Sequence, residues 1–197
     1  MSVDLYAQAE ATIGGASLRL QTEWPNSPEV SLAVAPAAGG DAHPLTLRLR
    51  MPGWLAEPTV RVALSTANAA GAEQFVGKRG DYLVISRSWS AGDTLTFSLP
   101  MALRSSRYTG LNQIPGHQRW AVEYGPVLLA ATGGAWNDAL DSMLLTGVRK
   151  PAEPSTWLEP SGEAPLHFRV LGAGNEAVRF VAYYLIQEEL FEVYPAV

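Results

Sequence analysis

The chain of 197 residues is 47% hydrophobic and carries a formal net charge of −5, a composition that suits one large or two small cores. Its 14 lysines and arginines are scattered without a basic block, which argues against nucleic acid as a partner. There are 0 cysteines, so disulfides, thiolate nucleophiles and cysteine-based metal sites are excluded in this chain.

Neither a leader nor a membrane span is expected from the sequence. Residues 1–15 lack a basic segment followed by an apolar core, so they do not resemble a secretory signal. No apolar run approaches the roughly 20 residues that a membrane-spanning helix needs. The sequence therefore predicts a soluble chain with no membrane partner, and it leaves the compartment open.

Apolar and polar residues alternate with a period of two through the first half of the chain. The pattern is clearest in LTLRLR at 45–50, where leucines alternate with Thr46, Arg48 and Arg50. It predicts a half-buried strand with the leucines inward and both arginines on the outer face. Similar alternations occur at 17–24, 29–36, 59–65 and 94–101, with a more apolar run at 81–89.

The strand at 45–50 ends in Met51-Pro52-Gly53-Trp54. Pro52 fixes its own φ and Gly53 permits a positive φ, which predicts a type II turn with these two residues at its centre. Such a turn would bring Trp54 to the edge of a sandwich, where packing against another domain is the interpretation we favour over a purely internal role.

The second half of the chain continues the pattern with shorter strands. Alternating or apolar stretches lie at 119–131, 165–170, 177–186 and 190–195, whereas 135–145 suits a turn or two of helix as well as a loop. Short strands with frequent Gly and Pro turns predict an all-β chain of two consecutive antiparallel β-sandwich, jelly-roll-like modules with little helix. The polar, Gly- and Pro-containing stretch after residue 101 suggests modules at 1–106 and 107–197.

Candidate catalytic residues are scarce. His43, His117 and His167 are isolated, without the neighbouring ligands that metal sites usually draw from one element, and no GxSxG motif occurs. The carboxylates that fall in strand patterns lie on the polar sides and indicate solvated faces; these are Glu10, Glu23, Glu123 and Glu192. Glu123, flanked by aromatic residues in WAVEYGP, is the best candidate for an autonomous enzyme. We nevertheless predict no catalytic, cofactor-binding or metal-binding residue in this chain.

The six tryptophans divide into core residues and candidates for a contact surface. Trp24, Trp89 and Trp120 continue apolar alternations and are expected in the core. Trp54, Trp136 and Trp157 stand beside turns or in loops, so they are candidates, together with Arg48 and Arg50, for contacts with another domain or with a sugar.

Several stretches in order resemble the C-terminal part of glycoside hydrolase family 127, the β-L-arabinofuranosidase family. LYAQAEATIGGASLRLQTEWP, LTLRLRMPGW, GDYLVISRSWSAGDTLTFSLPMALR, WAVEYGPVLLAA, STWLEP and FVAYYLIQEELFEVYP carry the resemblance over nearly the whole chain. The Val-Asn-Gly that commonly follows the PGW strand is absent, Ala182 stands where relatives often have Pro, and Leu190 where they often have Arg. These departures concern loop shapes and sugar contacts more than the fold.

The resemblance implies a division of labour. Family members have an (α/α)₆ catalytic barrel with a zinc-bound cysteine nucleophile and a catalytic glutamate, and none of these residues maps onto a position of this sequence. Because a thiolate mechanism needs a thiolate, the chain alone is expected to be inert, with zinc only in the barrel. It would be an accessory region whose partner is that barrel, and it would self-associate without it. The alternative is a carbohydrate-binding module that acts weakly through turn-borne aromatics.

Overall fold

Strands form nearly all the regular structure in the computed structural model, which describes residues 1–37, 42–66 and 71–197. Within these residues the helical elements are two 3-10 turns, η1 (Pro154–Thr156) and η2 (Tyr183–Leu185). None of the helices in the described part of the chain has the length and apolar character to cross a membrane. The prediction of an all-β chain is confirmed.

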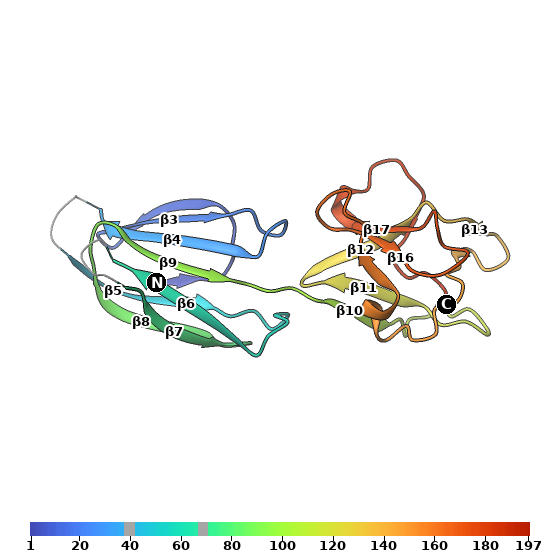
Figure 1. The fold of residues 1–197 in the computed structure, drawn as a ribbon, viewed down its shortest axis with the longest axis horizontal. Coiled ribbons are helices and arrows are strands. Elements are labelled where there is room, and N and C mark those ends of the chain that lie inside the picture. The colour runs from blue at the N-terminus through green and yellow to red at the C-terminus, as the bar shows by residue number, and fades with distance from the viewer. Residues whose placement is uncertain (38–41, 67–70) are drawn as a thin grey trace. The chain divides into compact units, whose positions relative to one another are not determined.

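The chain divides into two units, Met1–Met101 and Ala102–Val197, which are described separately (Figure 1). The sequence placed the boundary after residue 106, whereas the structure has it five residues earlier. The reason is the strand β10 (Leu103–Arg107), which pairs along its whole length with β11 (Trp120–Tyr124) of the second unit.

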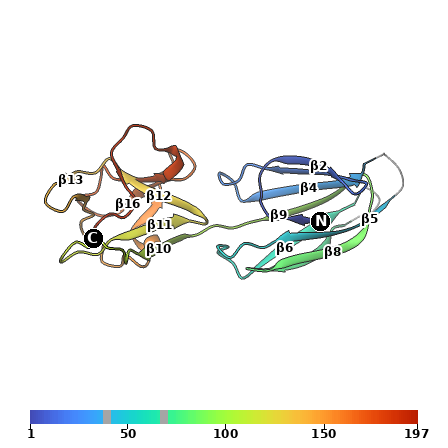
Figure 2. The ribbon, with the colours of Figure 1, turned by 180° about the vertical axis from the view of Figure 1, so that it is seen from behind.

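The first unit is a sandwich of two sheets. The larger sheet is antiparallel and has the order β2 (Ala9–Ile13), β3 (Ala16–Thr22), β4 (Glu29–Pro36), β9 (Asp93–Ser98), β6 (Thr59–Ser65) and β7 (Glu73–Lys78). The smaller sheet has the order β1 (Ser2–Val3), β5 (His43–Arg50) and β8 (Tyr82–Trp89), with β1 parallel to β5. Figure 2 shows both sheets from behind.

The core of the first unit lies between these two sheets, and the alternation in the sequence supplies it. Leu47 and Leu49 of β5 are fully buried, while Arg48 and Arg50 are exposed, as the pattern predicts. Of the three tryptophans expected in the core, only Trp89 is fully buried, and its indole N–H donates to the Leu45 carbonyl at 2.9 Å. Trp24 and Trp120 are only half-buried: Trp24 lies in the turn after β3, and Trp120 is the first residue of β11.

In the second unit a seven-stranded sheet and a hairpin share one core. The main path is β10, β11, β12 (Val127–Thr132), β17 (Arg179–Ala182), β16 (His167–Val170) and β15 (Leu158–Pro160). The short strand β18 (Phe191–Glu192) pairs with the far end of β12, beyond the part that β11 covers. The hairpin consists of β13 (Trp136–Asn137) and β14 (Ser142–Met143).

Two local predictions for this unit are corrected. The stretch 135–145 forms the β13–β14 hairpin rather than a helical turn or a plain loop, and buried Met143 anchors it in the core. The strand expected over 177–186 ends at Ala182, after which η2 leaves the sheet and exposes Tyr183 and Tyr184. Both corrections arise because apolar content alone does not distinguish a strand from a turn that packs on one.

Candidate functional site

Arg48 and Arg50 lie on the outer face of the small sheet in the first unit. Their neighbours across the β5–β8 pair are Val84 and Tyr82. The Arg48 guanidinium carbon lies 4.8 Å from the centre of the Tyr82 ring, and the Tyr82 hydroxyl donates to Asp4 Oδ1 at 2.5 Å. Val84 is 54% exposed beside them. We call Asp4, Arg48, Arg50, Tyr82 and Val84 the β5 face.

Two tyrosines of this region keep their hydroxyl protons. The hydrogen bond to the Asp4 carboxylate raises the pKa of Tyr82. The hydroxyl of buried Tyr6 donates to the Arg50 carbonyl at 2.6 Å, and burial raises the pKa of Tyr6 far above its usual range. At neutral pH the charges of the β5 face are therefore the two arginines and Asp4, which leaves an excess of one positive charge.

The turn after β5 differs from the prediction. Met51 continues the strand pairing, because its N–H donates to the Asp81 carbonyl at 2.8 Å and its carbonyl accepts from Gly80 at 2.7 Å. The turn consequently starts one residue late: the Leu55 N–H donates to the Pro52 carbonyl at 3.4 Å, so Gly53 and Trp54 are its central residues. Gly53 is not among the described residues with positive φ. The prediction of a type II turn centred on Pro52 and Gly53 is wrong.

This turn places Trp54 on the rim of the sandwich. Trp54 is half-buried against the first core and stacks on Trp24, with ring centroids 6.1 Å apart and an angle of 29° between the planes. One face of its indole is thereby covered within its own unit. A contact of Trp54 with another domain stays a prediction.

Trp136 and Trp157 differ sharply in exposure. Trp157 is 4% exposed and packs edge-on against Phe180 in the second core, at 5.8 Å between ring centroids. The expectation that it offers a contact surface is wrong, because η1 and β15 turn its side chain inward. Trp136 is half-buried on β13, where it lines a hollow. Because Trp157 is buried, it cannot contribute to an exposed aromatic surface.

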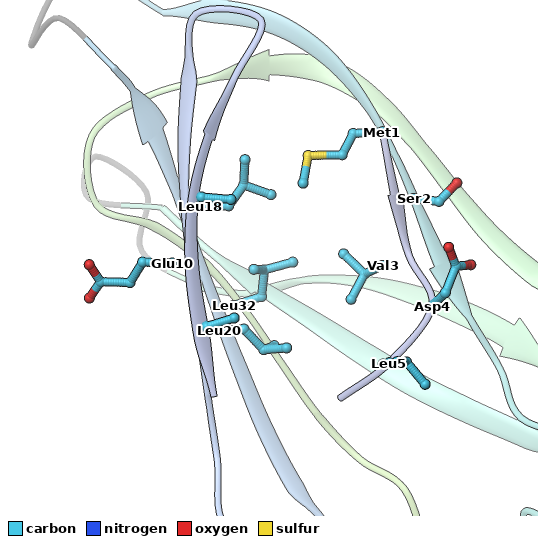
Figure 3. A pocket seen from close by; sticks show the side chains of 11 residues that line it. Met1, Ser2, Val3, Asp4, Leu5, Glu10, Leu18, Leu20 and Leu32 are labelled. Carbon is cyan, nitrogen blue, oxygen red and sulfur yellow. The ribbon is translucent and has the colours of Figure 1, made fainter. Parts of the chain in front are cut away.

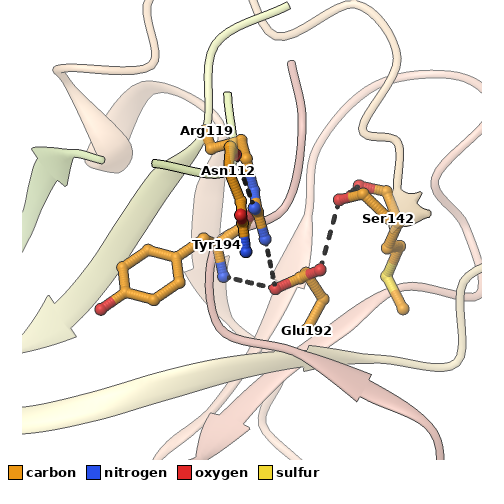
Figure 4. Close-up of polar contacts among 6 residues, drawn as sticks. Asn112, Arg119, Ser142, Glu192 and Tyr194 are labelled. Carbon is orange, nitrogen blue, oxygen red and sulfur yellow. Dashed lines mark hydrogen bonds and ion pairs between the residues drawn. The ribbon is translucent and has the colours of Figure 1, made fainter. Parts of the chain in front are cut away.

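Glu192 is a buried carboxylate that the sequence pattern missed. It lies on the inner side of β18, 8% exposed, rather than on a solvated face. Its Oε1 accepts from the Tyr194 N–H at 2.9 Å and from Arg119 Nη2 at 3.3 Å, and its Oε2 accepts from the Ser142 hydroxyl at 3.3 Å (Figure 4). Both oxygens of this carboxylate have hydrogen-bond partners, so we assign the cluster of Glu192, Arg119 and Ser142 a structural role.

The catalytic candidate Glu123 has a simple environment. On β11 it pairs with Arg104 of the neighbouring strand β10, 3.2 Å away, and both side chains are partly exposed. No second carboxylate shares this pair among the described ion pairs. The arrangement matches an ordinary cross-strand salt bridge.

An apolar hollow of about 170 Å³ opens beside β1 in the first unit. Figure 3 shows Met1 and Val3 pointing toward Leu18 and Leu32 across it, while Glu10 points away. It lies between β1 and β2, which are edge strands of the two sheets, and its lining offers few polar groups.

The first unit matches a known protein family. Residues 1–101 match the family model described as the middle domain of GH127 β-L-arabinofuranosidases. The chain belongs to the GH127 family. No curated protein matches it.

Solved structures share the fold of this GH127 chain. A GH127 β-arabinofuranosidase has a TM-score of 0.61 and 19% identity over 100% of this chain and 34% of its own length. For a GH127 β-L-arabinofuranosidase from Geobacillus stearothermophilus T6 the TM-score is 0.55 and the identity 20%, over 98% of this chain and 33% of that protein. For a protein described as a glycoside hydrolase the TM-score is 0.58 and the identity 15%, over 98% of this chain and 35% of that protein. The chain thus spans about a third of the length of these proteins.

The resemblance implies zinc in the catalytic barrel, and the residues of this GH127 chain do not fit such a site. The sequence holds no cysteine. Across 1–37, 42–66 and 71–197, no three His, Cys, Asp or Glu side chains gather closely enough to hold a metal ion. His43 begins β5, His167 begins β16 and His117 lies in the loop before β11, so the histidines are spread over separate elements.

Proposed function

We propose that this chain is a non-catalytic accessory region of a GH127 glycoside hydrolase, in which it supports a helical catalytic domain. The match of residues 1–101 to the GH127 middle domain carries the proposal. The chain also spans only about a third of the length of its structural relatives. The cysteine and zinc of the implied mechanism would belong to the catalytic domain, since this sequence has no cysteine.

The β5 face is the surface that we propose for contact with that domain. It combines two arginines with an exposed valine on the three-stranded sheet. Arg48 is held over Tyr82, and Tyr82 is held by Asp4, so the face is ordered before any partner binds. Such preorganised mixed surfaces lose little entropy on association. We expect an acidic, partly apolar surface on the partner, and self-association of the chain when that partner is missing.

Catalytic inactivity is tested with the purified chain and an aryl β-L-arabinofuranoside. We expect no release of the aryl group. Turnover that disappears in Glu123→Gln would instead establish an autonomous enzyme.

The accessory role is tested in the full-length protein. Arg48→Glu should lower the free energy of unfolding of the catalytic domain by about 2 kcal/mol, because it opposes the charge of the contact. Arg61→Glu is the matched control: Arg61 is an exposed arginine on β6 of the other sheet. Equal, small effects of the two variants on thermal unfolding would exclude the β5 face as the contact.

A further inference from the structure

A hollow of about 640 Å³ lies in the second unit, between the β13 hairpin and the loop 172–178. Its size falls within the range of about 300–1,000 Å³ that is typical of small-molecule sites. Trp136 and Asn137 line it from β13, Asp138 from the hairpin loop, and Glu176 from the opposite side. In Figure 1 the label β13 marks this hairpin at the right-hand side of the second unit.

The walls of the hollow are held in place. A Cβ on Gly133 would lie 2.4 Å from the Ala177 carbonyl oxygen, and one on Gly134 would lie 2.7 Å from Met143 Sδ. Gly133 therefore lets the start of the hairpin approach the loop closely, whereas Gly134 makes room for Met143 of the hairpin itself. On the other side, buried Asn175 donates from Nδ2 to the Thr146 carbonyl at 2.7 Å and accepts from the Thr146 N–H at 3.1 Å.

The polar groups at the rim are mostly acceptors. Both carboxylate oxygens of Glu176 accept from the Gly174 N–H, at 3.0 and 3.1 Å, which lowers the pKa of Glu176 and keeps it ionised. Asp138 is exposed, and none of the described hydrogen bonds or ion pairs uses its carboxylate. Asn137 uses Oδ1 to accept from Leu140, which leaves its Nδ2 as a donor toward a ligand. Of the described residues that line the hollow, none is cationic.

We propose that this hollow binds a neutral saccharide, with the Trp136 ring against a sugar face and Asp138 accepting from sugar hydroxyls. An aromatic ring beside acceptors suits a ligand with apolar C–H faces and many O–H donors. An anion would find no cationic side chain in the lining and would face the carboxylates of Asp138 and Glu176. A cationic amine fits less well, since such ligands are usually caged by several aromatic rings and Trp136 stands alone.

The first unit has a polar hollow of about 430 Å³ on its large sheet, but no aromatic side chain lines it, so it lacks a ring on which a sugar could stack.

This proposal does not rest on the accessory role, and it is tested with the 197-residue chain itself. L-arabinose, D-xylose and D-galactose are titrated at millimolar concentrations, and backbone amide shifts and tryptophan fluorescence are followed. We expect a Kd on the order of 1 mM for at least one sugar. The shifted amides should lie in 134–138 and 174–178.

Three variants separate binding from folding. Trp136→Ala should weaken binding at least about tenfold, because it removes the stacking ring, and Asp138→Asn about threefold, because a neutral amide oxygen is a weaker acceptor than a carboxylate. Tyr184→Ala is the control, since Tyr184 is an exposed aromatic in the same unit, 58% exposed, that does not line the hollow. If Trp136→Ala fails to fold, the exposed Asp138 variant and the amide shifts decide the question.

Several results would overturn the proposal. These are the absence of amide shifts with every sugar, shifts confined to other regions, and equal affinity in Trp136→Ala and Tyr184→Ala. Binding of choline or free lysine without binding of any sugar would assign the hollow to a cationic ligand instead. Binding that weakens steeply with added salt would point the same way, since a neutral ligand is insensitive to screening.

Discussion

The Arg119 guanidinium lies 3.3 Å from the Glu192 carboxylate, and the two side chains are only 13% and 9% exposed. Arg119 also donates to the Tyr194 carbonyl at 3.0 Å and to the Asn112 carbonyl at 3.0 Å. This pair therefore ties β18 and the C-terminal residues to the start of β11.

Removing one partner of this pair should be costly. Arg119→Met leaves Glu192 buried without its cation, and we expect a loss of about 3 kcal/mol in the free energy of unfolding. Adding Glu192→Gln to Arg119→Met should recover part of that loss, because the amide still accepts from Ser142 and carries no charge. Urea denaturation measures both. Arg169→Met is the control, since its exposed pair with Glu159 should contribute at most about 1 kcal/mol. Equal losses for Arg119→Met and Arg169→Met would contradict this account.

Two glycines of the first unit should respond oppositely to alanine. A Cβ on Gly77 would lie 2.6 Å from Met51 Cγ, so Gly77→Ala should destabilise by about 1–3 kcal/mol through overpacking. Gly53 has open space around it and no positive φ, so Gly53→Ala should be neutral or stabilise by up to about 1 kcal/mol. Thermal unfolding compares them. A clear loss for Gly53→Ala would restore the type II turn.

Trp157 and Trp54 should differ in their contribution to stability. Trp157→Ala removes a buried ring from the second core and should cost about 3–5 kcal/mol. Trp54→Ala removes a half-buried ring from the rim and should cost about 1 kcal/mol. Urea denaturation followed by circular dichroism measures both losses. A negligible effect of Trp157→Ala would mean that Trp157 is a surface residue after all.

Tyr6 should make stability depend on pH in the alkaline range. Its pKa is raised in the folded state, so its contribution is full below the unfolded pKa of about 10 and is lost as pH rises toward the folded value. Tyr6→Phe should cost about 1 kcal/mol at neutral pH, where only the hydrogen bond to Arg50 is lost.

At about pH 11 the penalty of Tyr6→Phe should vanish. The wild-type chain loses about 1.4 kcal/mol there because unfolding releases the Tyr6 proton, whereas phenylalanine has none to release. Urea denaturation of both chains at the two pH values checks this. A penalty that stays constant with pH would show that Tyr6 ionises normally in the folded chain.

Much of the first unit could be predicted from the sequence. The alternation in 45–50 depends only on neighbouring residues, and it correctly assigned Leu47 and Leu49 to the core and Arg48 and Arg50 to the outer face. The second unit was harder, because strands of two to four residues such as β13 and β18 are too short to show a period. Its buried charge at Glu192 follows from a partner 73 residues away, which no local pattern reveals.

By itself, the sequence determined the all-β class and the absence of a thiolate, because side-chain alternation and composition need no knowledge of what pairs with what. The tertiary structure decided where the indole rings of Trp54 and Trp157 lie, and that Trp136 borders a hollow with Glu176. Those outcomes depend on contacts between segments far apart in the chain, and strand topology alone brings such segments together.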